Sequence, residues 1–295
     1  AGNYILMMFY TTVSGWMLRY FFDTAKGDFV NADTNAVQNH FSNMNAIPSE
    51  MIFWATLVII VGFLVCSLGL QNGVEKISKV MMIALLVIMV VLAINSIFLE
   101  GAGKGLYFYL VPDFEQIKKV GLINVIVAAM NQAFFTLSIG MGSMTIFGSY
   151  LGKDRSLLGE SINIVALDTF VAIVSGLIIF PTCFAFGVSP DQGPKLIFVT
   201  LPNIFAKMPG GRIWGSCFFI FMAFAAFSTV IAVFENIMSS CMDLWKWSRK
   251  KTAIINAIII TVTSIPCVLG FNVWSGFMPF GKNTNVMDLE DFLIS

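Results

Sequence analysis

Long apolar stretches recur along the chain and are separated by polar segments. An α-helix needs about 20 apolar residues to cross the roughly 30 Å hydrocarbon core of a bilayer. Barrel strands would be shorter and would alternate apolar and polar residues, so the pattern favours spanning helices. The predicted transmembrane helices are seven: 1–22, 51–70, 80–99, 120–151, 161–186, 213–242 and 253–271.

Basic residues between these stretches indicate the orientation of the chain. They gather in three short loops, which contain Lys76 and Lys79, Lys153 and Arg155, and Lys246, Arg249, Lys250 and Lys251. The loops on the other side are longer and proportionally less basic, so the three short loops are predicted to be cytoplasmic. The outer segment 187–212 contains apolar clusters that predict two short helices, either as a lid or as a packed loop.

Composition agrees with a polytopic membrane protein. Of the 295 residues, 57% are hydrophobic and 12% are charged, against about 45–50% and about 25% in soluble domains. This excludes a disordered chain, a nucleic-acid binder and almost any soluble enzyme. The five cysteines lie in apolar stretches without CxxC spacing, which favours packing roles over disulfides or metal binding. The absence of an N-glycosylation sequon mildly favours a prokaryotic source, and hence a prokaryotic cell membrane.

The stretch 120–151 is too long for one straight span. Its middle, Phe134–Ser143, holds two glycines and three hydroxyl side chains. Glycine weakens a helix there, and hydroxyls can satisfy the freed backbone groups. Two interpretations stay open: a broken helix that exposes carbonyls to an ion or a substrate, or a small-residue face that packs against another helix.

Two carboxylates lie inside predicted spans. A charge at mid-membrane costs at least about 2.5–3.5 kcal/mol on insertion scales, so Asp168 must face a partner, a cavity or an ion. Glu235 raises the same question, although a structural hydrogen-bonding role would also explain it. The adjacent hydroxyls of Ser228 and Thr229 either bond to their own helix or act as hard oxygen ligands for a small cation. His40, in a polar outer segment, is expected to be exposed.

Several ordered motifs carry a resemblance to a known family. They are Tyr10 six residues before Trp16, GLYFYLVPDFE, FFTLSIGMG, FGSYL, AAFST and LEDF. With these motifs the chain resembles the neurotransmitter:sodium symporter family, specifically its bacterial amino-acid-transporting branch, over essentially its whole length. The resemblance implies a partial inverted-repeat symporter fold comprising the family's third to ninth helices and the start of the tenth. Residues 1–295 would then form a single transmembrane transporter domain, incomplete at both ends and a fragment of a longer protein.

The resemblance also implies roles for individual residues. Substrate-pocket positions are Leu6, Tyr10, Phe135, Ser138, Met141 and Val233, with the Tyr10 hydroxyl on the substrate carboxylate and Phe135 as a lid. First-sodium-site positions are Thr136 and Asp168. Second-sodium-site positions are Ala225 through its carbonyl, and Ser228 and Thr229 through their hydroxyls. Gate positions are Asp291 outside, and Asp243 and Tyr150 inside.

The sequence therefore predicts sodium-coupled symport of a neutral, hydrophobic amino acid by alternating access, with two sodium sites in the full-length protein. Many members of the family have Asn at the position of Asp168. The Asp168 carboxylate would supply the negative charge that a bound chloride supplies in chloride-dependent relatives, so no chloride requirement is expected. The expected partners are the amino acid, sodium and the bilayer, with no nucleic acid. A seven-helix receptor and an intramembrane hydrolase are the alternatives. The interrupted span argues against the first, and the lack of a GxSG or paired-aspartate motif argues against the second.

Overall fold

The computed structural model describes residues 2–68, 74–140, 142–149, 151–152, 155–185, 187, 196–282 and 284–294. All regular structure within these ranges is helical, which confirms the all-α prediction. The chain divides into two compact units. The first unit contains Ala1–Leu85 and Met208–Ser295, and the second contains Leu86–Lys207. The predicted positions Met141 and Tyr150 lie outside the described residues.

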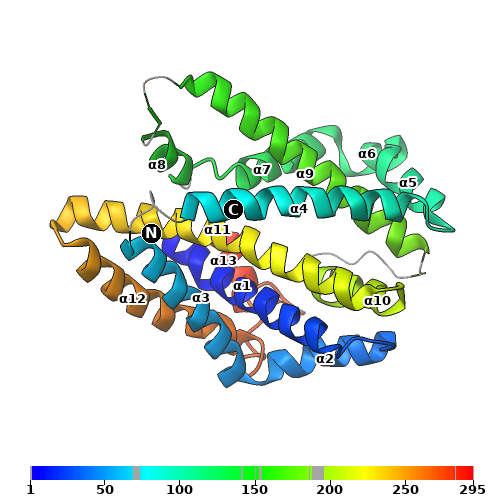
Figure 1. Cartoon of the computed structure of the whole chain (residues 1–295), viewed down its shortest axis with the longest axis horizontal. Helices are drawn as coiled ribbons and strands as arrows, with labels where there is room; N and C mark the ends of the chain where they lie inside the picture. Colours follow the sequence, from blue (N-terminus) through cyan, green and yellow to red (C-terminus); the bar gives the residue numbers. More distant parts are fainter. Residues whose placement is uncertain are drawn as a thin grey trace. The chain divides into compact units, whose positions relative to one another are not determined.

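The first unit is built around one central helix. Its helices are α1 (Gly2–Lys26), α2 (Thr34–Ala46), α3 (Pro48–Leu68), the first part of α4 (Val74–Ile97), α11 (Gly211–Trp245), α12 (Arg249–Gly270) and α13 (Val286–Ile294). Helix α1 packs most extensively against α11 and also contacts α3, α12 and α13 (Figure 1). Its side chains Met7, Trp16 and Tyr20 are almost completely buried. The core of this unit therefore surrounds α1.

Close helix crossings in the first unit depend on glycine. A Cβ at Gly15 of α1 would lie 2.9 Å from the Trp54 carbonyl carbon in α3, closer than real side chains approach backbone. Phe63 of α3 stacks on Phe234 of α11 with ring centroids 3.9 Å apart. Such close packing lets α1 and α3 bury their facing surfaces, and it holds α11 against both.

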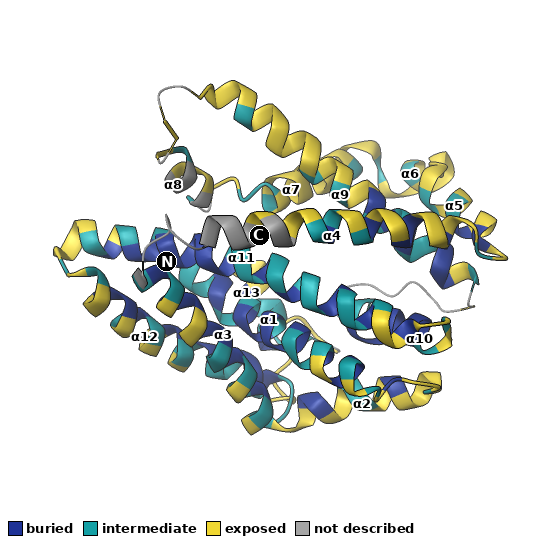
Figure 2. Cartoon of the chain, in the orientation of Figure 1, coloured by how far each residue is buried: buried dark blue, intermediate teal, exposed yellow. Residues whose placement is uncertain are grey.

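The second unit contains the rest of α4 and a series of shorter helices. They are α5 (Ala102–Leu110), α6 (Phe114–Val120), α7 (Leu122–Thr136), α8 (Ser143–Ser149), α9 (Leu157–Ala185), the π-helical turn η1 (Leu196–Thr200) and α10 (Leu201–Lys207). Tyr109 of α5 stacks on Phe180 of α9 at 5.0 Å. Much of α7 and α9 is exposed (Figure 2), including Ile123 and Leu158.

The predicted spans correspond to helices with shifted ends. Four helices are long and apolar enough to cross a membrane on their own: α3, α9, α11 and α12. The bent pairs α4–α5 and α6–α7, with angles of 115° and 94°, raise the number to six among the described residues. Helix α1 covers the first predicted span but is less apolar, because it carries Asn3 and Arg19 as well as Thr11, Thr12 and Ser14. These three hydroxyls are buried and donate to carbonyls one turn earlier in α1.

The long stretch 120–151 is broken, as its length and glycines suggest. Helix α7 begins after Gly121, which has φ +93°, and ends at Thr136; α8 starts at Ser143. The outer segment after α9 contains η1 and α10 as one continuous helical piece. The prediction of two separate short helices there is therefore only partly right.

Candidate functional site

The break after α7 has a defined capping geometry. The Ile139 amide donates to the Phe134 carbonyl at 2.9 Å, and the Ser138 amide donates to the Phe135 carbonyl at 3.0 Å. These two bonds form a Schellman motif, in which the residue after the C-cap takes a left-handed conformation. Here that residue is Ser138, with φ +53°, rather than the usual glycine. The chain thus holds a hydroxyl side chain at a backbone position that costs a non-glycine residue about 1–2 kcal/mol.

The last residue of α7 meets the carboxylate of α9. Thr136 Oγ1 donates a hydrogen bond to Asp168 Oδ1 at 2.9 Å. Asp168 lies within an otherwise apolar segment of α9 and is partly buried. The break therefore brings together the two residues predicted for the first sodium site, and it joins a carboxylate oxygen to a hydroxyl oxygen, which are ligands that small hard cations prefer.

In the first unit, α1 and α11 present matched side chains to each other. Leu6 and Tyr10 lie one turn apart on α1, and Thr229 and Val233 lie one turn apart on α11. The Tyr10 phenol lies close to the Thr229 side chain. Leu6 and Val233 are 3% and 1% exposed. The predicted substrate residues Leu6, Tyr10 and Val233 thus lie on the same two helices as the predicted sodium ligand Thr229.

The predicted second sodium site lies on α11. Ser228 Oγ donates to the Ala225 carbonyl at 2.7 Å. This is the local bond to its own helix that the sequence left open as an alternative. Together with Thr229, these groups place three oxygen atoms on adjacent turns of α11, so the donor set fits a small hard cation. Among the described residues, no group of three or more His, Cys, Asp or Glu could hold a metal ion.

The remaining predicted positions belong to both units. Phe135 and Ser138 are partly buried at the α7 break. The gate residues Asp243, near the end of α11, and Asp291, on α13, are both exposed. The two units carry different parts of the predicted site, so the geometry of each part is described within its own unit.

Two features of the first unit were not predicted. Glu235, 1% exposed, forms an ion pair with Arg249 of α12, and Arg249 Nε also donates to the Cys66 carbonyl of α3 at 2.7 Å. This confirms that Glu235 is hydrogen-bonded and identifies its partner. Because the Glu235 carboxylate is buried, removing its guanidinium partner is costly. The only sequence signal was a basic residue just past the end of the span that contains Glu235.

The expectation that His40 is exposed is wrong. Its Nε2 atom lies 2.9 Å from Asp23 Oδ2, and its side chain is 26% exposed. Arg19 Nε donates to the same Asp23 oxygen at 2.8 Å. Asp23 is 0% exposed, so Arg19 and His40 compensate a buried carboxylate where α2 meets the end of α1. No single residue type in the sequence signals such a contact between helices.

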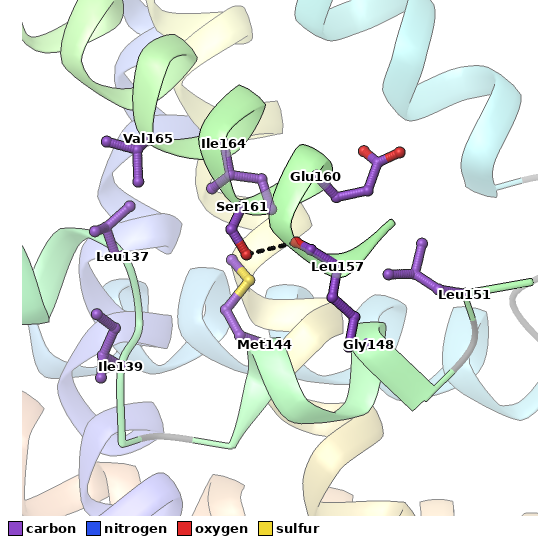
Figure 3. A pocket seen from close by; sticks show the side chains of 10 residues that line it. All are labelled: Leu137, Ile139, Met144, Gly148, Leu151, Leu157, Glu160, Ser161, Ile164 and Val165. Carbon is purple, nitrogen blue, oxygen red and sulfur yellow. Dashed lines mark hydrogen bonds between the residues drawn. The ribbon is translucent and has the colours of Figure 1, made fainter. Parts of the chain in front are cut away.

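A pocket of about 320 Å³ lies beside the α7 break in the second unit (Figure 3). Leu137 and Ile139 of the break, Met144 of α8 and the first turns of α9 line it. Ser161 points toward it, but its hydroxyl donates to the Leu157 carbonyl at 2.8 Å. Thr136, Ser138 and Asp168 do not line this pocket. It is an apolar space next to the predicted ion site and distinct from it.

Comparisons with known proteins agree on one family. The sequence model of the sodium:neurotransmitter symporter family matches residues 22–276. An uncharacterized sodium-dependent transporter of Bacillus subtilis, YhdH, is 31% identical over 300 residues, covering 100% of this chain and 64% of its own length. An uncharacterized sodium-dependent transporter of Haemophilus influenzae is 29% identical and covers 99% and 64%.

A solved structure extends the likeness to three dimensions. The crystal structure of MhsT in complex with L-phenylalanine is 38% identical and matches with a TM-score of 0.91. The match covers 100% of this chain and 66% of MhsT. The chain therefore spans slightly less than two thirds of the length of the curated relatives it matches.

Proposed function

The chain belongs to the sodium:neurotransmitter symporter family, and from this premise we propose that its protein couples sodium entry to the uptake of a neutral, hydrophobic amino acid. The family and its named relatives are sodium-dependent transporters and not enzymes. The hydrolase alternative is therefore set aside. With its apolar helices, the chain is part of a multi-pass cell-membrane protein.

The substrate proposal rests on the pairing of α1 with α11. Leu6 and Val233 supply aliphatic walls, which suit a hydrophobic side chain. The Tyr10 phenol supplies a donor for a carboxylate, and a hydrogen bond to a charged group contributes about 1.5–3 kcal/mol. MhsT, which is 38% identical to this chain over the matched part, was crystallised with L-phenylalanine. An amino acid of that chemical class is the substrate we propose.

The single observation that carries the proposal is the hydrogen bond between Thr136 and Asp168. A carboxylate within an apolar span needs a compensating partner, and a hydroxyl alone leaves its charge uncompensated. Sodium bound between the two oxygens would compensate that charge. Ala225, Ser228 and Thr229 would bind a second sodium ion in the first unit.

The carboxylate of Asp168 also bears on whether transport needs chloride. Its carboxylate places a negative charge beside the proposed first ion, and bound sodium ions without such a charge would repel each other strongly at low dielectric. We infer that transport by the full-length protein does not require chloride.

Alternating access would then follow from exchange between two packings of the helices. Phe135 would cover the bound substrate, Asp291 would close the outer side, and Asp243 with Tyr150 the inner side. The driving force is sufficient. One sodium ion gains about 2.3 kcal/mol at 100 mV and about 1.4 kcal/mol from a tenfold gradient, so two ions support roughly 10⁵-fold accumulation.

Equilibrium binding tests this proposal. The protein, expressed from its complete gene and purified in detergent, is titrated with radiolabelled L-phenylalanine in sodium or in potassium buffer. We expect saturable binding in sodium and little in potassium, with competition by leucine but not by glutamate. Binding that is equal in both cations would contradict sodium coupling. Sodium-dependent binding of glutamate instead would contradict only the substrate class.

A further inference from the structure

The turn between α11 and α12 presents an unusual set of side chains at the helix ends. It consists of Lys246, Trp247 and Ser248. At the end of α11, Leu244 and Trp245 are 74% and 55% exposed. Lys246, Lys250 and Lys251 are exposed as well. The segment 244–251 contains no acidic residue, although the exposed Asp243 directly precedes it, so it combines exposed apolar groups with an excess of positive charge.

This turn is held firmly by the one basic residue that points inward. The Arg249 guanidinium pairs with buried Glu235 and donates to the Cys66 carbonyl at 2.7 Å. These bonds fix the start of α12 to α11 and α3. The lysines on either side of Arg249 are therefore carried by an anchored segment, and their charges keep a defined position at the surface.

The two tryptophans form an aromatic pair beside the lysines. The rings of Trp245 and Trp247 lie 4.8 Å apart with an interplanar angle of 33°. Lys251 Nζ lies 5.0 Å from the centre of the Trp247 ring, which is a cation–π contact. Tryptophan is enriched where a membrane protein meets the headgroup layer, because its ring is apolar and its N–H is polar. The tryptophan pair beside the lysines is therefore the kind of side-chain set found at the headgroup layer.

Lys246 occupies a backbone position that disfavours lysine. It follows the last residue of α11, and its φ is +53°. Glycine takes this left-handed conformation without steric cost and is the common residue there, whereas a side chain with a Cβ is strained. The chain keeps a positive charge where glycine would stabilise the turn better. A strained residue at a surface suggests a function for its side chain.

We propose that the segment Leu244–Lys251, the basic turn, binds the headgroups of anionic phospholipids on the cytoplasmic side of the membrane. Lys246, Lys250 and Lys251 would contact lipid phosphates, and the exposed Leu244 and Trp245 would enter the boundary with the acyl chains. Each lysine near an anionic surface is expected to raise the affinity about fivefold. The proposal needs only a membrane-spanning first unit, so it stands independently of sodium coupling and of the substrate.

The test is a lipid titration of the purified full-length protein. Thermal unfolding in detergent is followed while phosphatidylglycerol or neutral phosphatidylcholine is added, because a ligand of the folded state raises the midpoint according to its affinity. The variants are Lys250→Gln with Lys251→Gln, and Lys246→Gly. The matched control is Lys282→Gln, an exposed lysine in the loop beyond the opposite end of α12.

We expect phosphatidylglycerol to bind the wild type more tightly than phosphatidylcholine. The double variant should lose about 30-fold in affinity for phosphatidylglycerol, and Lys246→Gly about fivefold. Without added lipid, Lys246→Gly should unfold at the same or a higher temperature than the wild type, because glycine relieves the strain. Lys282→Gln should behave like the wild type.

Several results would overturn the proposal. Equal binding of phosphatidylglycerol and phosphatidylcholine would show that the lysine charges have no role in lipid binding. An equal loss of affinity for phosphatidylglycerol in Lys282→Gln would show that only the net charge of the protein matters. Wild-type affinity in Lys246→Gly would show that its lysine has no part in binding. Equal protection by soluble glycerol phosphate would assign the site to free phosphate rather than to a phospholipid.

Discussion

Replacement of Asp168 by asparagine changes one charge in α9 and almost nothing else. In the wild type, Asp168 Oδ1 accepts a hydrogen bond from Thr136 Oγ1 at 2.9 Å. The asparagine carbonyl has the same reach and can still accept that bond. The variant therefore keeps the contact between α7 and α9 while it removes the negative charge that we propose binds sodium.

The expected loss can be bounded from this geometry. A hydrogen bond or ligand contact to a charged group contributes about 1.5–3 kcal/mol net, against about 0.5–1.5 kcal/mol for a neutral pair. The Coulomb term alone is larger, about 4 kcal/mol for unit charges 4 Å apart at an effective dielectric of 20, but desolvation offsets part of it. Sodium affinity should therefore fall by about one to two decades.

The assay is the sodium concentration that gives half-maximal amino-acid uptake in proteoliposomes containing the full-length protein. It is measured in chloride and in gluconate buffer. Glu160→Gln is the matched control, because Glu160 lies on the same helix, is partly exposed and pairs at 3.2 Å with the exposed Arg155. We expect wild type and Glu160→Gln to behave alike in both buffers, and Asp168→Asn to need far more sodium. Added chloride should restore part of the loss only in the Asp168→Asn variant, where a charge is missing.

Three results would contradict the assignment of Asp168 to the ion site. If the wild type requires chloride, the Asp168 carboxylate does not replace an anion. If Asp168→Asn has the sodium dependence of the wild type, Asp168 is not a ligand, and its hydrogen bond with Thr136 is purely structural. An equal effect of Glu160→Gln would indicate a general response of α9 to lost charge.

Three further predictions concern the first unit. Tyr10→Phe should weaken amino-acid affinity by one to two decades, from the loss of a charge-assisted bond, and leave sodium binding intact; unchanged affinity in a competition assay would mean that Tyr10 only packs. Arg249→Met should lower the free energy of unfolding by about 3–5 kcal/mol because the buried Glu235 carboxylate loses its guanidinium partner, and a second change, Glu235→Met, should recover most of it; failure to recover would place the cost in lost contacts of Arg249. His40→Ala should loosen α2 by about 1.5 kcal/mol through its lost contact with Asp23, seen as faster amide hydrogen exchange in α2 alone; unchanged exchange would show that the contact adds no stability.

The helices were predictable because lipid-spanning segments need long apolar runs, and such runs are visible directly in the sequence. The broken helix was also predictable, since no straight span is as long as residues 120–151. The residue at which the helix breaks was harder to predict. Sequence reasoning pointed to Gly140 and Gly142, whereas the helix ends earlier, with Ser138 in the left-handed position. A serine there gives no compositional signal, because the conformation is imposed by the capping bonds.

Contacts between distant polar residues were the least predictable part of the site. Arg249 was counted as a loop charge that sets orientation, yet it reaches Glu235 and the Cys66 carbonyl. His40 was expected in solvent, yet it contacts Asp23. Apolar periodicity shows which residues are buried, but it does not show which buried polar groups meet across helices. The family resemblance supplied the pairing of Thr136 with Asp168, which periodicity alone would have missed.

Concentrative uptake of the amino acid is the direct sign of coupling to sodium. Proteoliposomes containing the full-length protein are loaded with potassium and diluted into sodium buffer with radiolabelled L-phenylalanine. We expect transient accumulation above the external concentration, which disappears when gramicidin collapses the sodium gradient. Uptake that only equilibrates, or that is the same with and without a sodium gradient, would contradict sodium-coupled transport.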